Sequence, residues 1–308
     1  MGVKARVIPG FLDRVLEEEV PARGTVVDLM SGTGVVAAFC ADRYRVFAND
    51  VQEYAHVIAR SLIEHNPGEK EAFLRSVDAR KDLFEAFREN LRALEGFYAP
   101  ALKAETTLLE RFATGEDDPG WCRDYRTFLE EPGSVYGAME PDGGGNGHGG
   151  LYAGAGRLLS EGSLASYRTD AGLRPACLVT AYYANVYFGL RQSLEIDSLR
   201  AAIDDMDSGD PHAGLKRVHY LSALLHAASI STSGTSHFAQ PRHLHKDSEL
   251  RAMAKRRCID IFSRLEECSG DILATVRETR DLEGNGCFVG DYRGLIEEGS
   301  GGPCFRFP

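Results

Sequence analysis

The feature that most constrains the fold of this chain is the alternation of strands and helices in residues 24–65. Residues 24–29 (GTVVDL) and 43–50 (RYRVFAND) are short apolar runs, each with an acid at or near its end. A glycine-containing turn and a helical pattern separate them, and residues 51–66 again carry apolar side chains at helical spacing. Such alternation is typical of a parallel, doubly wound sheet, and we therefore predict an α/β protein.

The remaining periodic segments are mostly helical. Residues 70–113 are rich in Leu, Ala, Phe, Arg and Glu and predict helix, whereas residues 114–150 become polar and glycine-rich and predict a loop. The run 177–189 (CLVTAYYANVYFG) predicts a strand. Residues 247–268 predict one amphipathic helix, and residues 286–296 (GCFVGDYRGLI) predict a further short strand that ends in an acid.

Composition limits the class of protein. The 308 residues include 35 Lys or Arg and 46 Asp or Glu, which gives a net charge of −11. No apolar run approaches the 18 or so residues that a membrane helix needs. The seven cysteines form no CxxC pair, and the nine histidines form no HExxH motif. We therefore expect a cytoplasmic protein with reduced thiols, no membrane segment and no metal site.

Positive charge is concentrated in one region of this acidic chain. Residues 216–257 contain eight Lys or Arg and two Asp or Glu. Such a patch can neutralise phosphates while the rest of the protein stays acidic. The alternative is an ordinary solvated helix face.

The turn between the first two predicted strands has the sequence DLMSGTG, residues 28–34. Gly32 and Gly34 have no Cβ, so a ligand can approach the backbone closely. Ligands of open parallel sheets bind at this carboxyl end of the strands. The spacing differs from GxGxxG and from GxxxxGK[ST], which disfavours a dinucleotide and a nucleoside triphosphate.

Two acids at neighbouring strand ends fit S-adenosylmethionine better. Asp28 would lie near the methionine ammonium, and Asp50 would accept hydrogen bonds from the two ribose hydroxyls. The alternative is a plain strand–turn–helix connection with two solvated acids.

Several motifs, in order along the chain, resemble the Dam-like adenine-specific DNA methyltransferases. The opening MGVKARVIP is similar to the glycine–lysine motif of that family, DLMSGTG to its DxFxGxG motif, and the AND at 48–50 to its ribose motif. The segment NVYFG at 185–189 resembles the Asn-x-Pro-Phe-Gly of the DNA-recognition region. CFVGDY at 287–292 resembles the acidic strand end that lies against the cofactor adenine.

The resemblance implies a partial Rossmann-like, S-adenosylmethionine-dependent methyltransferase sheet with a mainly helical insertion. It implies a cofactor site formed by Gly2, Lys4, Asp28, Met30, Ser31, Gly32, Thr33, Gly34, Asp50, Asp291 and Tyr292. Together with the local charge, it predicts contacts with double-stranded DNA from Asn185, Arg191, Arg242 and Lys246.

The same resemblance implies a division of the chain into four segments. Residues 1–65 would be the cofactor-binding subdomain and residues 66–175 a helical and loop insertion. Residues 176–285 would form the DNA-recognition region, and residues 286–308 would return to the sheet.

The catalytic Asp-Pro-Pro-Tyr motif of the family is missing from these 308 residues. We therefore assign no catalytic residue and expect a truncation, a frameshift or a split enzyme whose second polypeptide carries that motif. The first strand would then lie at an edge of the sheet. The expected function is methylation of adenine N6 in DNA, in a restriction–modification system or by an orphan methylase, with this chain alone inactive. The alternatives are an RNA or small-molecule methyltransferase, or a non-catalytic DNA-binding remnant.

Overall fold

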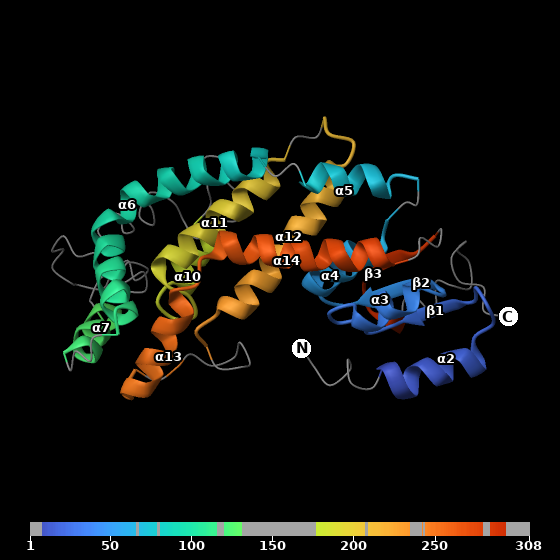
Figure 1. The fold of residues 1–308 in the computed structure, drawn as a ribbon, viewed down its shortest axis with the longest axis horizontal. Coiled ribbons are helices and arrows are strands. Elements are labelled where there is room, and N and C mark those ends of the chain that lie inside the picture. Colours follow the sequence, from blue (N-terminus) through green and yellow to red (C-terminus); the bar gives the residue numbers. More distant parts are fainter. Residues whose placement is uncertain are drawn as a thin grey trace. The chain divides into compact units, whose positions relative to one another are not determined.

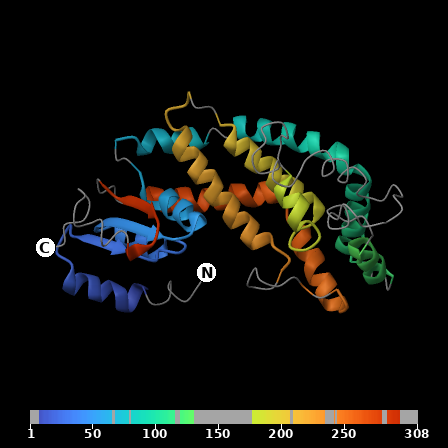
Figure 2. The same ribbon diagram turned by 180° about the vertical axis from the view of Figure 1, so that it is seen from behind.

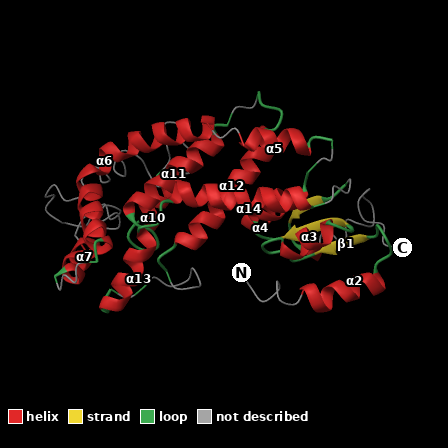
Figure 3. Ribbon diagram, in the orientation of Figure 1, coloured by secondary structure: helices red, strands yellow, loops and turns green. Residues whose placement is uncertain are grey.

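In the computed structural model of the protein, helices predominate and the described strands form one small sheet (Figure 3). The structure describes residues 8–65, 68–78, 81–115, 120–130, 177–206, 209–234, 242, 244–279 and 284–293.

The elements, in chain order, begin with a π-helical turn at Ile8–Leu12. The helices and strands that follow it are labelled in Figure 1. They continue as α2 (Asp13–Glu19), β1 (Thr25–Asp28), α3 (Val35–Ala41), β2 (Arg45–Asp50), α4 (Glu53–Ile63), α5 (Lys70–Asp78), α6 (Lys81–Ala113), α7 (Trp121–Glu130), α10 (Leu178–Tyr183), α11 (Leu190–Asp204), α12 (Ala213–Ser231), α13 (Asp247–Arg257), α14 (Ile261–Glu278) and β3 (Gly286–Val289).

The chain divides into two compact units, each assembled from separate stretches of sequence. The first unit comprises residues 1–80, 207–225 and 267–308, and it contains the sheet. The second comprises residues 81–206 and 226–266, and its described elements are helical. The four-segment division expected from the sequence remains a prediction.

The sheet of the first unit has the order β1-β2-β3, and both pairs are parallel. Thr25–Asp28 of β1 pair with Arg45–Ala48 of β2, and Phe47–Asp50 of β2 pair with β3. Three of the four strands predicted by the sequence, and the α/β class, are therefore confirmed. Among the described strands, β1 lies at one edge of the sheet.

Helices α2, α3 and α4 form a core with the sheet because their apolar residues recur on one side. The buried members of this cluster are Leu16, Ala37, Cys40, Ala41, Tyr44, Val46, Ala48, Ala59 and Ile63. Small side chains at Ala37, Ala41 and Ala59 allow the helices to approach closely. Burial raises the pKa of the Cys40 thiol to about 11, which keeps it in the protonated form.

β3 joins the sheet from a distant part of the sequence and lies beside the earlier strands in Figure 2. Asn285 secures its start, because its Oδ1 accepts a hydrogen bond from the Val46 N–H (2.8 Å) and its Nδ2 donates to the Ile63 carbonyl (3.3 Å). The Arg45 guanidinium donates to the carbonyl of Gly284 (2.8 Å), which has φ of 90°.

Three buried carboxylates hold the helix N-termini of the second unit. Glu105 of α6 accepts the first N–H groups of α11, those of Leu190 and Arg191, at 2.8 Å each. Asp197 of α11 accepts two N–H groups at the start of α10, and Glu195 of α11 accepts the first N–H of α14 (3.0 Å). These side chains satisfy donors that a helix cannot satisfy internally.

Three sequence predictions are wrong in this unit. The predicted strand 177–189 is helix α10 followed by a turn, because the Asp197 carboxylate caps residues that look strand-like in isolation. The single helix predicted for 247–268 is broken between α13 and α14, where Asp260 accepts the Ser263 N–H (2.6 Å). Residues 121–130, predicted as loop, form α7, whose Trp121 is buried.

The burial of Asp197 predicts a pH-dependent contribution to stability. Burial raises the pKa of Asp197 to about 7, from an ordinary value of 3.8, although the Thr180 and Val179 hydrogen bonds oppose the shift. A carboxyl group whose pKa is higher in the folded state than in the unfolded state stabilises the folded state. This stabilisation is complete when the pH is below the pKa of the unfolded state, and it is lost as the pH rises to about 7. In urea unfolding, the wild type should therefore lose part of its advantage over Asp197→Asn between pH 4.5 and 8. An advantage that grows with pH would contradict the prediction.

Candidate functional site

The carboxyl ends of the three parallel strands lie at one edge of the sheet. Asp28 ends β1, Asp50 ends β2 and Val289 ends β3, so the loops that follow them are neighbours. This edge carries the glycine turn of residues 29–34, and it is the usual ligand-binding edge of open parallel sheets.

Asp50 holds the glycine turn through its side chain. Its Oδ2 accepts the Gly32 N–H (2.8 Å) across the gap between two strands, and its Oδ1 accepts the Gln52 N–H (3.0 Å). The Ser31 N–H donates to the Asn49 carbonyl (2.9 Å), and the Gly34 N–H donates to the Ser31 carbonyl (3.0 Å). The glycine turn and the end of β2 are thus joined by direct hydrogen bonds.

The two glycines of the turn are required for different reasons. Both have positive φ, 55° for Gly32 and 69° for Gly34. A Cβ at Gly34 would lie 3.0 Å from the Ala59 Cα of α4, so the space there is already filled by the protein. A Cβ at Gly32 would meet no atom within 4 Å among the described residues. Gly32 therefore borders open space in which a ligand can lie.

The chemistry of this edge fits S-adenosylmethionine. The half-buried Asp50 carboxylate has four acceptor positions and uses two for backbone N–H groups, which leaves capacity for ribose hydroxyls. Ser31 Oγ and Asn49 Oδ1 are buried and have no hydrogen-bond partner among the described residues. Met30 and Tyr292 are 70% and 42% exposed and present apolar surface in the loops after β1 and β3.

The other predicted cofactor residues are placed as follows. Asp28 is half-buried at the end of β1, and Thr33 is exposed in the turn. Asp291 follows β3 and is exposed, and its carboxylate pairs with Arg293 at 2.5 Å. That ion pair lowers the pKa of Asp291 to about 2. Gly2 and Lys4 lie outside the described residues.

The predicted DNA-binding residues belong to the second unit, and most have partners within it. Asn185 has φ of 63°, and its Oδ1 accepts from the buried Arg257 (3.4 Å). Arg191 pairs with Glu95 and with Glu195 (3.0 Å). Arg242 pairs with Glu249 (2.5 Å) and donates to the Ser233 carbonyl (2.9 Å). Lys246 precedes α13 and is exposed.

Asn49 is the site residue that the sequence analysis did not assign. Its Nδ2 donates to the carbonyls of Leu29 (3.2 Å) and Gly290 (3.1 Å), which belong to the loops after β1 and β3. An amide next to the acid at a strand end was the available signal, but its partner Gly290, in the loop after β3, is far away in the sequence.

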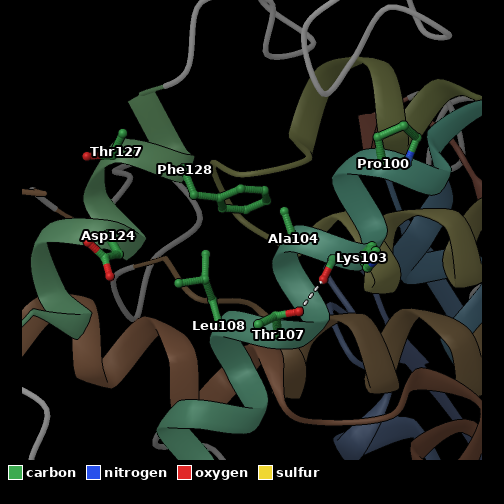
Figure 4. Close-up of a pocket in the computed structure, with 8 residues that line it drawn as sticks. All are labelled: Pro100, Lys103, Ala104, Thr107, Leu108, Asp124, Thr127 and Phe128. Carbon is green, nitrogen blue, oxygen red and sulfur yellow. Dashed lines mark hydrogen bonds between the residues drawn. The ribbon is translucent and has the colours of Figure 1, made fainter.

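A separate surface hollow lies in the second unit, along α6 and α7 (Figure 4). Its lining residues are Pro100, Lys103, Ala104, Thr107, Leu108, Asp124, Thr127 and Phe128. Phe128 extends toward Ala104 in Figure 4, and the Asp124 carboxylate pairs with Arg111 (3.1 Å). The lining offers no cluster of reactive groups, and it contains none of the predicted site residues.

The described residues lack two further features. They contain no group of three or more His, Cys, Asp or Glu arranged to hold a metal ion. None of their helices combines the length and apolar character needed to cross a membrane.

The first unit is thus an α/β unit whose glycine turn and strand-end acid form a site at the carboxyl edge of a parallel sheet. Residues 11–106 match the family described as D12 class N6 adenine-specific DNA methyltransferase. The resemblance to Dam-like adenine methyltransferases is therefore confirmed over this range, which includes the glycine turn and Asp50. No curated protein and no solved structure matches the chain.

The contrast between the two glycines can be tested by substitution. Gly32→Ala should lower the free energy of unfolding by about 1 kcal/mol, which is the cost of a positive φ with a Cβ. Gly34→Ala should cost roughly 2–4 kcal/mol, because the contact with Ala59 adds to that strain. Urea unfolding of both variants measures the difference. Equal losses would contradict the assignment of open space to Gly32.

Proposed function

We propose that this chain is the cofactor-binding and DNA-recognition part of an S-adenosylmethionine-dependent methyltransferase that acts on adenine N6 in DNA. The observation that carries the proposal is the hydrogen bond from the Gly32 N–H to Asp50 Oδ2. It joins the glycine turn to the strand-end acid, and both lie within residues 11–106, which match the methyltransferase family.

The residues of the edge would bind and orient the cofactor. Asp50 would accept hydrogen bonds from the ribose hydroxyls while its Gly32 and Gln52 bonds keep the carboxylate in place. The open side of Gly32 would admit the ligand close to the backbone. Tyr292 would cover one face of the adenine. When bound, S-adenosylmethionine supplies an electrophilic methyl group to an amine.

No catalytic residue is assigned to this chain. The amine of adenine is paired inside duplex DNA, so an enzyme that methylates it has to extrude the base. The family uses Asp-Pro-Pro-Tyr to receive the amine and the base, and that sequence does not occur in these 308 residues. Methyl transfer is therefore proposed for an assembly in which another polypeptide segment supplies these groups.

DNA contacts are proposed for Lys246, Arg242, Arg191 and Asn185 of the second unit. Lys246 is exposed at the start of α13, whose last turn carries the exposed Lys255 and Arg256. Phosphate contacts by such side chains would position DNA without reading its sequence. A second candidate substrate is RNA or a small molecule. The intramolecular ion pairs of Arg191 and Arg242 favour the small molecule, because these two guanidinium groups already have carboxylate partners in place of phosphates.

The ribose role of Asp50 predicts a loss of cofactor affinity on substitution. Asp50→Ala removes a charged acceptor, so the Kd for S-adenosylmethionine should rise roughly 10- to 100-fold in calorimetry. Because Asp50 also holds the turn, the same titration is made with a 2′-deoxyribose analogue of S-adenosylhomocysteine, for which the loss should be smaller. Undiminished binding of S-adenosylmethionine by the variant would rule out the assignment.

The role of Lys246 predicts a change in the salt dependence of DNA binding. Lys246→Gln should weaken binding to duplex DNA of any sequence and reduce the slope of log K against log salt by about 1. Lys81→Gln is the matched control, because Lys81 is an 81% exposed lysine at the start of another helix of the same unit. Equal slopes for both variants would remove Lys246 from the DNA contact surface. Salt-independent binding by the wild type would favour a small-molecule substrate.

A further inference from the structure

One side chain, that of Asn49 in β2, bonds to the loops that follow both neighbouring strands. Asn49 is 2% exposed, and its Nδ2 donates to the carbonyl of Leu29 (3.2 Å) after β1 and to that of Gly290 (3.1 Å) after β3. A primary amide nitrogen carries two hydrogens, so one is available to each loop.

These two contacts lie just beyond the paired part of each outer strand. The backbone pairing of β1 ends at Asp28 and that of β3 ends at Val289. Leu29 and Gly290 are the next residues. The Gly290 N–H still donates to the Asp50 carbonyl (3.1 Å), and the Asn49 amide adds a side-chain bond to the Gly290 carbonyl and another to the Leu29 carbonyl. The Asn49 side chain therefore continues the hydrogen bonding of the sheet into the two loops that border Asp50.

We propose that Asn49 is a positioning residue of the cofactor site. It sets the distance between the glycine turn and the loop of Asp291 and Tyr292 by holding a backbone carbonyl of each. Asn49 acts through these loops and does not itself need to touch the ligand. The inference rests on the proposed function of this edge as a binding site for S-adenosylmethionine.

The chemistry of the side chain limits what can replace it. An aliphatic residue would leave two carbonyls without their donor, and a buried carbonyl without a donor destabilises the folded state. An ionised aspartate would direct an oxygen at both carbonyls and repel them. Loss of the amide would therefore release both loops together.

Asn285 provides a matched control at the other end of the sheet. It also makes two hydrogen bonds with its amide, from the Val46 N–H (2.8 Å) and to the Ile63 carbonyl (3.3 Å). These contacts lie at the amino end of β3, away from the glycine turn. Asn285→Ala should therefore weaken the sheet without releasing the loops at the carboxyl edge.

The test compares Asn49→Ala and Asn285→Ala in the full chain. Without ligand, Asn49→Ala should raise amide hydrogen exchange in residues 29–34 and 290–293 together, whereas Asn285→Ala should leave exchange there unchanged. In calorimetry, the Kd for S-adenosylmethionine should rise about tenfold or more for Asn49→Ala, which corresponds to the loss of about two neutral hydrogen bonds. It should change less than about twofold for Asn285→Ala, as expected for a site left intact.

Two results would overturn the proposal. One is that Asn49→Ala leaves both the amide hydrogen exchange of the two loops and the Kd for S-adenosylmethionine unchanged. The other is that Asn49→Ala and Asn285→Ala change them equally, which would give Asn49 a purely structural role. If the wild type does not bind S-adenosylmethionine, the proposed function fails, while the exchange comparison still decides whether Asn49 holds the two loops. If Asn49→Ala does not fold, Asn49→Asp keeps the volume, and it should show the same changes.

Discussion

The first unit depends on the central strand β2, because both other strands pair with it. β2 supplies the backbone partners of β1 and β3, and its last two residues supply the side chains that order the loops beyond them. Asp50 reaches the glycine turn on one side of the strand end, and Asn49 reaches both flanking loops. The geometry of the site is therefore set mainly by one dipeptide at the end of one buried strand.

The second unit is organised by a different physical constraint, the N–H groups at helix starts. Glu105, Glu195 and Asp197 are each at most 4% exposed, and each accepts hydrogen bonds from the first turn of another helix. Gly189 permits this arrangement at α11, because a Cβ there would lie 2.8 Å from the Glu105 carboxylate. These three acidic residues, which the amino-acid composition alone would place at the surface, lie in the interior of the second unit.

These two constraints explain how much could be predicted from the sequence. The alternating pattern of residues 24–65 predicted β1, β2 and the turn correctly, because strand length, apolar run and glycine spacing are local signals. α10 was predicted as a strand because its cap, Asp197, lies outside the segment. The break before α14 depends on Asp260 and Glu195 together, and only Asp260 is local. The contacts of Asn49 could not be predicted, since one partner, Gly290, is near the other end of the sequence.

The position of β3 has a consequence for the order in which the protein can fold during synthesis. β1 and β2 are complete once residue 50 has been made, but β3 begins at Gly286. The free energy of closing so long a loop grows only slowly with its length, so the equilibrium stability of the sheet is little affected. The timing is affected strongly, because one side of β2 lacks its native partner while the helices from α4 to α14 are being translated. During that interval, the exposed strand edge is open to pairing with other chains, and assistance from a chaperone would be most useful then.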